Sequence, residues 1–287
     1  MAEEMKVLST RQKLLKRMLQ NRKAVFGAVV LLVIIIGAIS APLLTRFNPN
    51  EQDLDNRLLP PSWTNLLGTD NFGRDVFTRI LYGGRISLQI GLISVGIGVV
   101  FGCLIGLIGG FYGGIIDGIL MRFVDILLAL PGFLLALSIV AALGPNLQNV
   151  MIAVGISNIP RFARIMRASV MQTRELDYVT AALAAGASDF RILFKHVMPN
   201  SINPVIVQAS LGLATAILAA SGLSFLGMGA QPPTPEWGSM IAQARPFIRL
   251  AHWIVTFPGL AIVVTVLALN LVGDGLRDIF DPRLKDN

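Results

Sequence analysis

Residues Tyr178–Pro199 have the sequence YVTAALAAGASDFRILFKHVMP, and this stretch interrupts an otherwise apolar chain. Its small and apolar residues form two short helical patterns that meet at Gly186. Apolar segments of membrane-spanning length lie on both sides of it. A membrane protein that holds a partner at its cytoplasmic face needs such an element, so we interpret the stretch as a docking segment between spans.

The composition indicates a helical membrane protein. Hydrophobic residues make up 54% of the 287 residues, charged residues only 14%, and the mean hydropathy is +0.67. These values are typical of a polytopic membrane protein rather than a globular enzyme. The net charge of +7 does not indicate nucleic-acid binding, because the cations lie next to apolar segments, where they contact membrane lipids and set the topology.

Six segments are long and apolar enough to cross a membrane as helices. They are about Ala24–Leu44, Ile86–Phe111, Ile115–Leu143, Val150–Ala168, Val205–Met228 and Trp253–Val272. We therefore expect an all-α polytopic fold with six transmembrane helices, in which residues 24–287 form a single transmembrane domain. The first apolar run is too long for a signal-peptide core, so we expect a retained anchor.

Cations set the expected orientation. The tail 1–23 is rich in Lys and Arg, and placing it in the cytoplasm also places there the loop before the fifth span, the C-terminus and most of the 24 cations. Residues 178–199 are then cytoplasmic, whereas 45–85 and 229–252 are outer loops. Leu14, Leu15 and Met18 between the tail's cations suit a helix in the membrane interface, and a solvated basic tail is the alternative.

The second span carries a glycine every four residues. These are Gly98, Gly102, Gly106, Gly110 and Gly114. The spacing places them on one helix face, where a neighbouring backbone can approach closely. We favour static packing on this face over a surface that slides during transport.

Two further spans carry polar groups. Asp117, Arg122 and Asp125 lie in the third span, where Arg122 and Asp125 can pair on one helix face, and we favour a structural ion pair over a proton relay. In the fourth span, Asn158 and Pro160 predict a kink, and Arg161 begins a basic stripe that continues with Arg164 and Arg167. Contact with lipid phosphates and a position along a transport pathway or gate remain equally good interpretations of Asn158, Pro160 and Arg161.

No catalytic or metal-binding constellation is expected in this chain. His196 and His252 are the only histidines, Cys103 is the only cysteine, and no phosphate-binding G-x-x-x-x-G-K-[ST] motif is present. The spans lack central carboxylates that would couple transport to an ion. A partner would therefore supply the energy for any powered transport.

Two outer segments look structured. LGTDNFGRDVFTRILYGGRISL, residues 67–88, suggests a turn that leads into an amphipathic helix with Val76, Ile80 and Leu81. GMGAQPPTPEWGSM, residues 227–240, is stiffened by prolines and ends near Trp237. An anchor at the membrane interface and a contact with an external delivery protein are both compatible with this tryptophan.

These motifs resemble a known family. The stretch from Thr180 is similar to the E-A-A–x3–G–x9–I-x-L-P loop of binding-protein-dependent ABC-transporter permeases, with Ala181, Ala182, Gly186 and Pro199 in place. Thr180, His196 and Met198 stand where that motif has Glu, Ile and Leu, and the histidine form looks like the peptide subclass. The two outer segments and LALNLVGDGLRDIFDPRLK, residues 267–285, resemble the dipeptide/oligopeptide/nickel permeases of "C" type, most closely those for dipeptides.

The resemblance implies a fold, partners and site residues. It implies an importer permease of type I, with a core of about five helices after an extra first helix. The expected partners are a homologous second permease, two ABC ATPases that bind ATP and Mg²⁺, an extracytoplasmic peptide-binding protein and the lipids of the bacterial inner membrane. The expected ATPase-coupling residues are Thr180, Ala181, Ala182, Ala185, Gly186, Phe190, His196 and Pro199. The expected binding-protein contacts are Asp70, Arg74, Asp75 and Trp237.

In this interpretation the alanines keep the first short helix thin, Gly186 permits the turn, and Ser188 caps the second helix. Phe190, Leu193, Phe194 and Val197 are expected to seat that helix against the membrane domain. The substrate is left open among dipeptides, oligopeptides, glutathione and nickel chelates. An ion-coupled secondary carrier and a structural scaffold are the other classes, and both fit the motifs less well.

Overall fold

The structure, a computed structural model, describes residues 19–280, which form α-helices joined mostly by short connections and contain no β-strand. The long helices are α2 (Arg22–Ile39), α4 (Val76–Tyr112), α5 (Gly114–Leu128), α6 (Gly132–Leu143), α7 (Leu147–Arg174), α11 (Asn203–Phe225) and α13 (Trp253–Phe280). The short ones are α3 (Ala41–Leu44), α8 (Asp177–Ala184), α9 (Asp189–Arg191), α10 (Met198–Ser201) and α12 (Trp237–Ala244). The predicted interfacial tail lies mostly outside the described residues.

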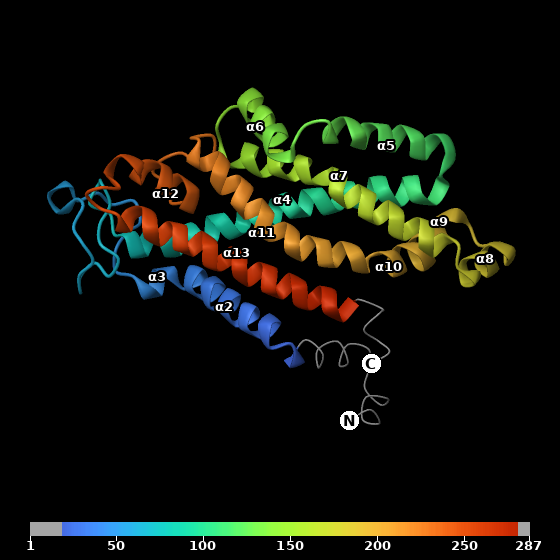
Figure 1. The fold of residues 1–287 in the computed structure, drawn as a ribbon, viewed down its shortest axis with the longest axis horizontal. Coiled ribbons are helices and arrows are strands. Elements are labelled where there is room, and N and C mark those ends of the chain that lie inside the picture. The colour runs from blue at the N-terminus through green and yellow to red at the C-terminus, as the bar shows by residue number, and fades with distance from the viewer. Residues whose placement is uncertain (1–18, 281–287) are drawn as a thin grey trace.

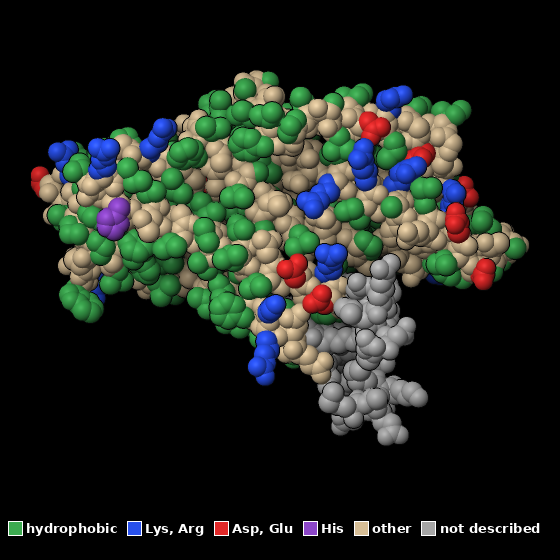
Figure 2. Space-filling view, viewed as in Figure 1, with side chains coloured by type: hydrophobic (Ala, Val, Ile, Leu, Met, Phe, Trp, Pro, Cys, Tyr) green, Lys and Arg blue, Asp and Glu red, His purple; other side chains and the backbone are tan. Residues whose placement is uncertain are grey.

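The long helices lie roughly along one axis of an elongated bundle (Figure 1). One end carries α12 and the loop after α3, and the other carries α8 and α9; we call them the α12 end and the α8 end. The start of α2 meets the end of α13, where Asn21 Nδ2 donates to Asp278 Oδ2 at 3.0 Å. Apolar side chains cover much of the visible surface (Figure 2), as expected for helices that face lipid.

Four described helices, α2, α4, α11 and α13, are long and apolar enough to cross a membrane, and α5 with α6 counts as a fifth. Helix α7 covers the fourth predicted span but does not meet the same criterion, because polar and basic residues interrupt its apolar run. It packs inside the bundle against α4, α6 and α11. Helix α4 begins at Val76 rather than Ile86, so the last part of the expected outer loop 45–85 is helical.

The expectation of one continuous helix over Ile115–Leu143 is wrong. Helices α5 and α6 are bent by 84° where they meet. Pro131 lies at the break, and proline both lacks the N–H that a helix interior needs and disfavours a helical conformation at the preceding residue. The bend brings Phe133 against Gly222 of α11 and Gly132 near Ser157 of α7.

The glycine face of α4 packs against α7, and the two helices run parallel. A Cβ on Gly98 would lie 2.9 Å from Cβ of Asn158, and one on Gly102 would lie 2.7 Å from the carbonyl oxygen of Ile159. Gly106 and Gly110 meet the next turns of α7 in the same way. Gly114 is the exception, because it begins α5 and a Cβ there would have no neighbour within 4 Å. The other four glycines therefore form the closely packed surface that the spacing predicts.

The acidic residues of α5 pair with arginines of α7. Asp117 accepts two hydrogen bonds of 2.6 Å from Arg167, and Asp125 accepts one of 2.8 Å from Arg164. The predicted Arg122–Asp125 pair is therefore wrong, and Arg122 forms no ion pair within residues 19–280. Pairing between two helices joins α5 to α7, which a pair within one helix would not do.

Asp117→Asn is expected to lower the thermal stability of the purified protein. Arg167 would then lose its bidentate partner at a site where the two side chains are 32% and 17% exposed, at a cost of about 1–3 kcal/mol. Asp125→Asn is the matched control, because that pair is 58% and 53% exposed and such pairs contribute about 0–1 kcal/mol. A larger loss of melting temperature for Asp125→Asn than for Asp117→Asn would contradict the assignment.

Candidate functional site: the α8 element and the α7 cavity

The segment 177–201 forms a projecting element at the α8 end (Figure 1). Helix α8 ends at Ala184, and Gly186, which has a φ of +78°, follows the C-cap residue Ala185. The N–H groups of Gly186 and Ala187 donate to the carbonyls of Leu183 and Ala182 at 2.9 and 3.1 Å. This is a Schellman motif, in which glycine adopts the left-handed conformation that closes a helix. The predicted helix–glycine–helix shape of the segment is therefore confirmed.

After the turn, the chain forms α9, a π-helical segment, Ile192–Val197, and α10. Ser188 occupies the N-cap position of α9, but its side chain makes no capping hydrogen bond. Pro199 follows the π-helical segment and has no N–H to continue a regular ladder. The carbonyl of His196 accepts a hydrogen bond from Asn200 Nδ2 at 2.7 Å and one from Tyr178 Oη at 3.4 Å, and the second of these joins α8 to the π-helical segment.

Four apolar side chains fix this element to the rest of the bundle. Val179, Ile192, Leu193 and Val197 are buried within the main hydrophobic core. Below them, Ser201 Oγ donates to Thr173 Oγ1 at 3.0 Å in a buried contact. The element is therefore packed onto the bundle, with α8 in contact with α7 and with the π-helical segment.

The outer surface of the element is apolar and exposed. Phe190 is 73% exposed, Leu183 51%, and Tyr178 and Phe194 about 40%. The expectation that Phe190 and Phe194 seat the second helix against the bundle is therefore wrong, whereas it is confirmed for Leu193 and Val197. The two phenylalanine rings instead pack against each other, with their ring centroids 4.6 Å apart.

The remaining coupling residues lie around this surface. Thr180, Ala181, Ala185, Gly186 and Pro199 are exposed, whereas Ala182 and His196 are half-buried. The structure thus places most of the predicted coupling residues where a partner can reach them.

A second candidate site is a cavity of about 620 Å³ between α7, α11 and the α5–α6 break. The polar residues that line it are Ser157, Asn158, Arg161, Arg164 and Thr215. The structure brings two of the predicted pathway residues, Asn158 and Arg161, to this cavity, whereas Pro160 is buried and helix α7 continues through it. Basic side chains gather over α5 and α7 on the face shown in Figure 2.

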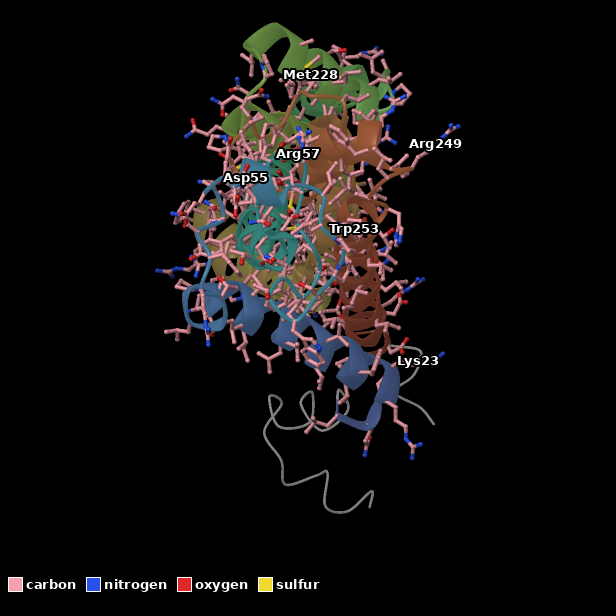
Figure 3. The ribbon with its side chains drawn as sticks, turned by 90° about the vertical axis from the view of Figure 1, so that its left-hand side faces the viewer. Lys23, Asp55, Arg57, Met228, Arg249 and Trp253 are labelled. Carbon is pink, nitrogen blue, oxygen red and sulfur yellow. The ribbon has the colours of Figure 1, made fainter. Side chains whose placement is uncertain are left out.

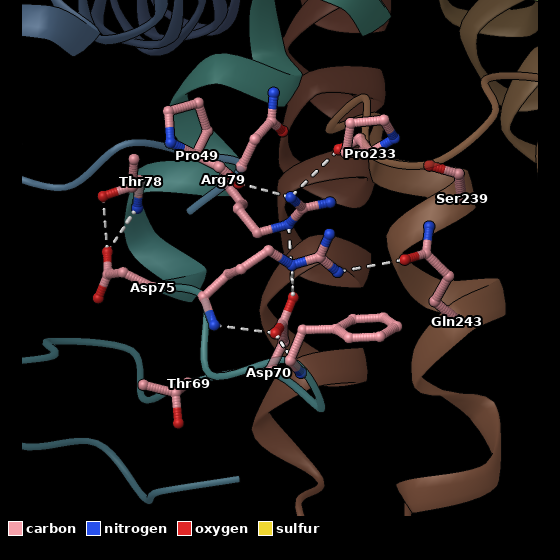
Figure 4. Close-up of polar contacts among 12 residues, drawn as sticks. Pro49, Thr69, Asp70, Asp75, Thr78, Arg79, Pro233, Ser239 and Gln243 are labelled. Carbon is pink, nitrogen blue, oxygen red and sulfur yellow. Dashed lines mark hydrogen bonds and ion pairs between the residues drawn. The ribbon is translucent and has the colours of Figure 1, made fainter. Parts of the chain in front are cut away.

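The α12 end differs from expectation. Asp70, Arg74, Asp75 and Trp237 are all at least nine-tenths buried within this chain, so they are not available to an external protein in this conformation. Arg74 Nε donates to Asp70 Oδ2 at 2.7 Å (Figure 4), and Asp75 caps α4 by accepting from the N–H of Thr78 at 2.8 Å. The charged residues that lie close together in this stretch of sequence therefore stabilise the fold of the outer loop.

Arg79 holds three segments of this end together. Its Nη1 donates to the carbonyls of Pro49 and Pro233 at 2.6 and 3.3 Å (Figure 4). Trp237 lies beside it, with Nε1 donating to the carbonyl of Ile80 at 3.0 Å. Trp237 and Pro235 therefore pack inward against α4, whereas Pro232 and Pro233 are exposed.

Glu236 caps α12 from a fully buried position. Its carboxylate accepts hydrogen bonds from the N–H groups of Gly238 and Ser239 at 2.9 and 2.8 Å. Burial raises the pKa of Glu236 above its usual value, whereas those two hydrogen bonds act in the opposite direction. The sequence analysis did not single out this residue, because Glu is not among the usual N-cap residues Ser, Thr, Asp and Asn.

The raised pKa of Glu236 predicts a pH-dependent stability. The folded protein holds the Glu236 proton to higher pH than the unfolded chain, whose carboxyl titrates near 4.5. Its contribution to stability is therefore greatest below that value and is lost as pH rises through the folded-state pKa. Glu236→Gln should remove this dependence. The melting temperature of the wild type minus that of the variant should therefore be larger at about pH 4 than at about pH 8. A constant difference would contradict the assignment.

The surface that the α12 end presents comes from residues missed by the sequence analysis. A cavity of about 790 Å³ is lined by the exposed acidic side chains Glu51, Asp53 and Asp55. Trp63 is 98% exposed. Seen from this end, Asp55 and Arg57 lie over the middle of the bundle, and Arg249 projects away from it (Figure 3). No helix periodicity marks this loop, so only the structure separates its exposed residues from its buried ones.

Within residues 19–280, no group of His, Cys, Asp and Glu could hold a metal ion.

Comparison with known proteins agrees with this architecture. Residues 98–286 match the family of binding-protein-dependent transport system inner membrane components. Residues 9–61 match the N-terminal transmembrane domain of oligopeptide transport permease C. The dipeptide transport system permease protein DppC of Escherichia coli is 52% identical over 272 residues, covering 93% of this chain and 91% of that protein. The protein of the same name from Alkalihalophilus pseudofirmus is 48% identical over 270 residues, covering 94% and 89%.

Among solved structures, the MetNI methionine ABC transporter in an inward-facing conformation has a similar fold. It has a TM-score of 0.57 at 19% identity, over 71% of this chain and 97% of that one. At that identity the likeness establishes only the fold, which is that of an ABC importer permease. Together, the bundle, the projecting α8 element and the sequence matches show that the chain belongs to the family of binding-protein-dependent ABC-transporter permeases, and within it to the peptide permeases of C type.

Proposed function

We propose that this chain is a non-catalytic permease subunit of an ATP-driven importer for di- and oligopeptides and forms half of the translocation pathway. The observation that carries the proposal is the α8 element, in which exposed apolar residues are held rigidly on the core of the bundle. The names of the close relatives support peptides as the substrate class.

The proposed complex contains a homologous second permease, two ABC ATPases and an extracytoplasmic peptide-binding protein. The ATPases bind ATP and Mg²⁺. They also bind the α8 element, with Phe190 and Leu183 at the contact. Because Val179 and Ile192 bury this element in the core, closure of the ATPases moves α7 and α10 with it. The cavity beside α7 then alternates between the two sides of the membrane.

This function requires the α8 end to be cytoplasmic. The start of α2 and the end of α13 both point toward that end (Figure 1), so both termini would lie on the ATPase side of the inner membrane. The basic residues over α5 and α7 support the same orientation. The binding protein would then meet the acidic loop around Asp53 at the α12 end.

Reconstitution tests the proposal. The complex is isolated through a tag on this chain and placed in liposomes, and uptake of a labelled dipeptide is measured. Uptake is expected only with ATP on the α8 side and the binding protein on the other, and it should disappear when the ATPases carry a catalytic-carboxylate substitution. Uptake by this chain alone, driven by an ion gradient without ATP, would instead establish a secondary carrier.

A further inference from the structure

Among residues 19–280, Arg161 is the one arginine lining the α7 cavity that has no acidic partner. It makes no hydrogen bond or ion pair with another residue in the range 19–280, whereas the neighbouring Arg164 is paired with Asp125. The other polar side chains of the cavity are neutral and bond to nearby backbone carbonyls of their own helices. They are Ser157, Asn158 and Thr215. The described residues that line the cavity therefore offer an unpaired positive charge and no unpaired negative one.

This charge lies near the middle of the apolar part of the bundle. Asn158 packs against Gly98, which is at the centre of the apolar run Ile86–Phe111 of α4. Arg161 is three residues further along α7, about 4.5 Å toward the α8 end. An unpaired arginine at this depth is costly, and such residues persist where they face a water-filled cavity on a substrate pathway.

The chemistry of the cavity favours a carboxylate. A guanidinium binds a carboxylate through two parallel N–H···O bonds, and it remains charged at any physiological pH. Peptides carry one carboxylate at their C-terminal end and one ammonium group at the other. Asp125 does not line the cavity, so the described lining residues offer the ammonium group no free acid there.

We propose that Arg161 binds the C-terminal carboxylate of the peptide while it crosses the membrane, an inference that rests on the proposed function. The opposite end of the peptide would be recognised by the second permease. The size of the cavity, about 620 Å³, is sufficient for a small peptide, since pockets for small ligands measure about 300–1,000 Å³.

The test compares dialanine with dialanine amide in liposomes that hold the complete complex. Each is supplied at a concentration that saturates the binding protein, as established by separate titration, so that the uptake rate reports steps inside the permease. The wild type is expected to transport dialanine roughly tenfold faster than the amide, the factor that one charge-assisted hydrogen-bonded pair provides. Arg161→Gln should lower dialanine uptake to the amide rate and leave the amide rate unchanged.

Two further variants make the result specific. Arg161→Lys should retain part of the preference for the free carboxylate, because it keeps the charge but loses the planar fork. Arg122→Gln is the matched control, since Arg122 is an exposed arginine of α5 that does not line the cavity, and it should leave the ratio at the wild-type value.

Other outcomes would overturn the inference. If Arg161→Gln and Arg161→Lys lower the uptake rates of dialanine and of its amide equally, Arg161 contributes to the pathway without binding the carboxylate. If Arg161→Gln changes neither rate, the cavity is not where the peptide is recognised. Wild-type complex that shows no ATP-dependent peptide uptake would overturn the proposed function itself, which is a different result from a changed or unchanged ratio.

Discussion

Replacing Gly106 with alanine is expected to destabilise the protein strongly, whereas the same change at Gly96 of the same helix should be neutral or stabilising. A Cβ on Gly106 would overlap the carbonyl oxygen of Ala163 and lie 2.8 Å from the backbone nitrogen of Arg167. Backbone atoms cannot rotate away as a side chain can, so α4 and α7 would have to separate. Overpacking of this kind costs about 1–3 kcal/mol and occasionally more, and here it acts on the central helix pair.

Gly96 provides the matched control because a Cβ there has nothing within 4 Å. Alanine is favoured over glycine in a helix interior by up to about 1 kcal/mol, so Gly96→Ala should not lower stability. The measurement is the melting temperature of the two variants in detergent, with the yield of folded protein beside it. Equal melting temperatures for Gly106→Ala and Gly96→Ala would show that α4 does not pack on α7 as described.

The second large effect is expected at the turn between α8 and α9. Gly186→Val should abolish ATP-dependent peptide uptake while the protein still folds and inserts. The φ of +78° at Gly186 is costly for a β-branched residue, but a Cβ there has nothing within 4 Å. The strain is therefore released by changing the turn, which alters the angle at which α8 leaves the bundle, and the hydrophobic core is left intact.

A matched glycine exists at the opposite end of the molecule. Gly227 has a φ of +80° and open space around it, and it closes α11 through the same Schellman pattern, with Met228 N–H donating to the Leu223 carbonyl at 2.9 Å. Gly227→Val therefore carries the same local strain without touching α8. Co-purification with the ATPases and substrate-stimulated ATPase activity should be lost only for Gly186→Val. Normal stimulated activity in that variant would refute the docking assignment.

Local patterns in the sequence predicted several features correctly. The turn at Gly186 follows from an alanine-rich helix that ends at glycine, and the packing face of α4 follows from glycines spaced four apart. Both depend on residues within one or two helical turns of each other. Asn158 and Arg161, which line the α7 cavity, were also singled out by a local pattern, because they are polar residues within an apolar run.

The errors have a common cause, which is that the sequence does not show which helices are neighbours. Asp125 pairs with Arg164 of α7 rather than with Arg122 on its own helix. Phe190 looks like a core residue by composition, yet it lies on the outer surface of the α8 element. Asp70 and Trp237 look like surface residues of the two outer segments, yet both are buried where those segments fold against α4.

The sequence by itself determined the class of the protein, because hydropathy over about 20 residues and the period of a helix are local quantities. It also determined the helix–glycine–helix shape of residues 178–199 through their composition and Gly186. Only the tertiary structure decided that this segment presents Phe190 outward, that α5 and α6 part at Pro131, and that Arg161 lacks an acidic partner within the described residues. These depend on which side chains from distant segments meet, and close packing selects those contacts only once the whole bundle has formed.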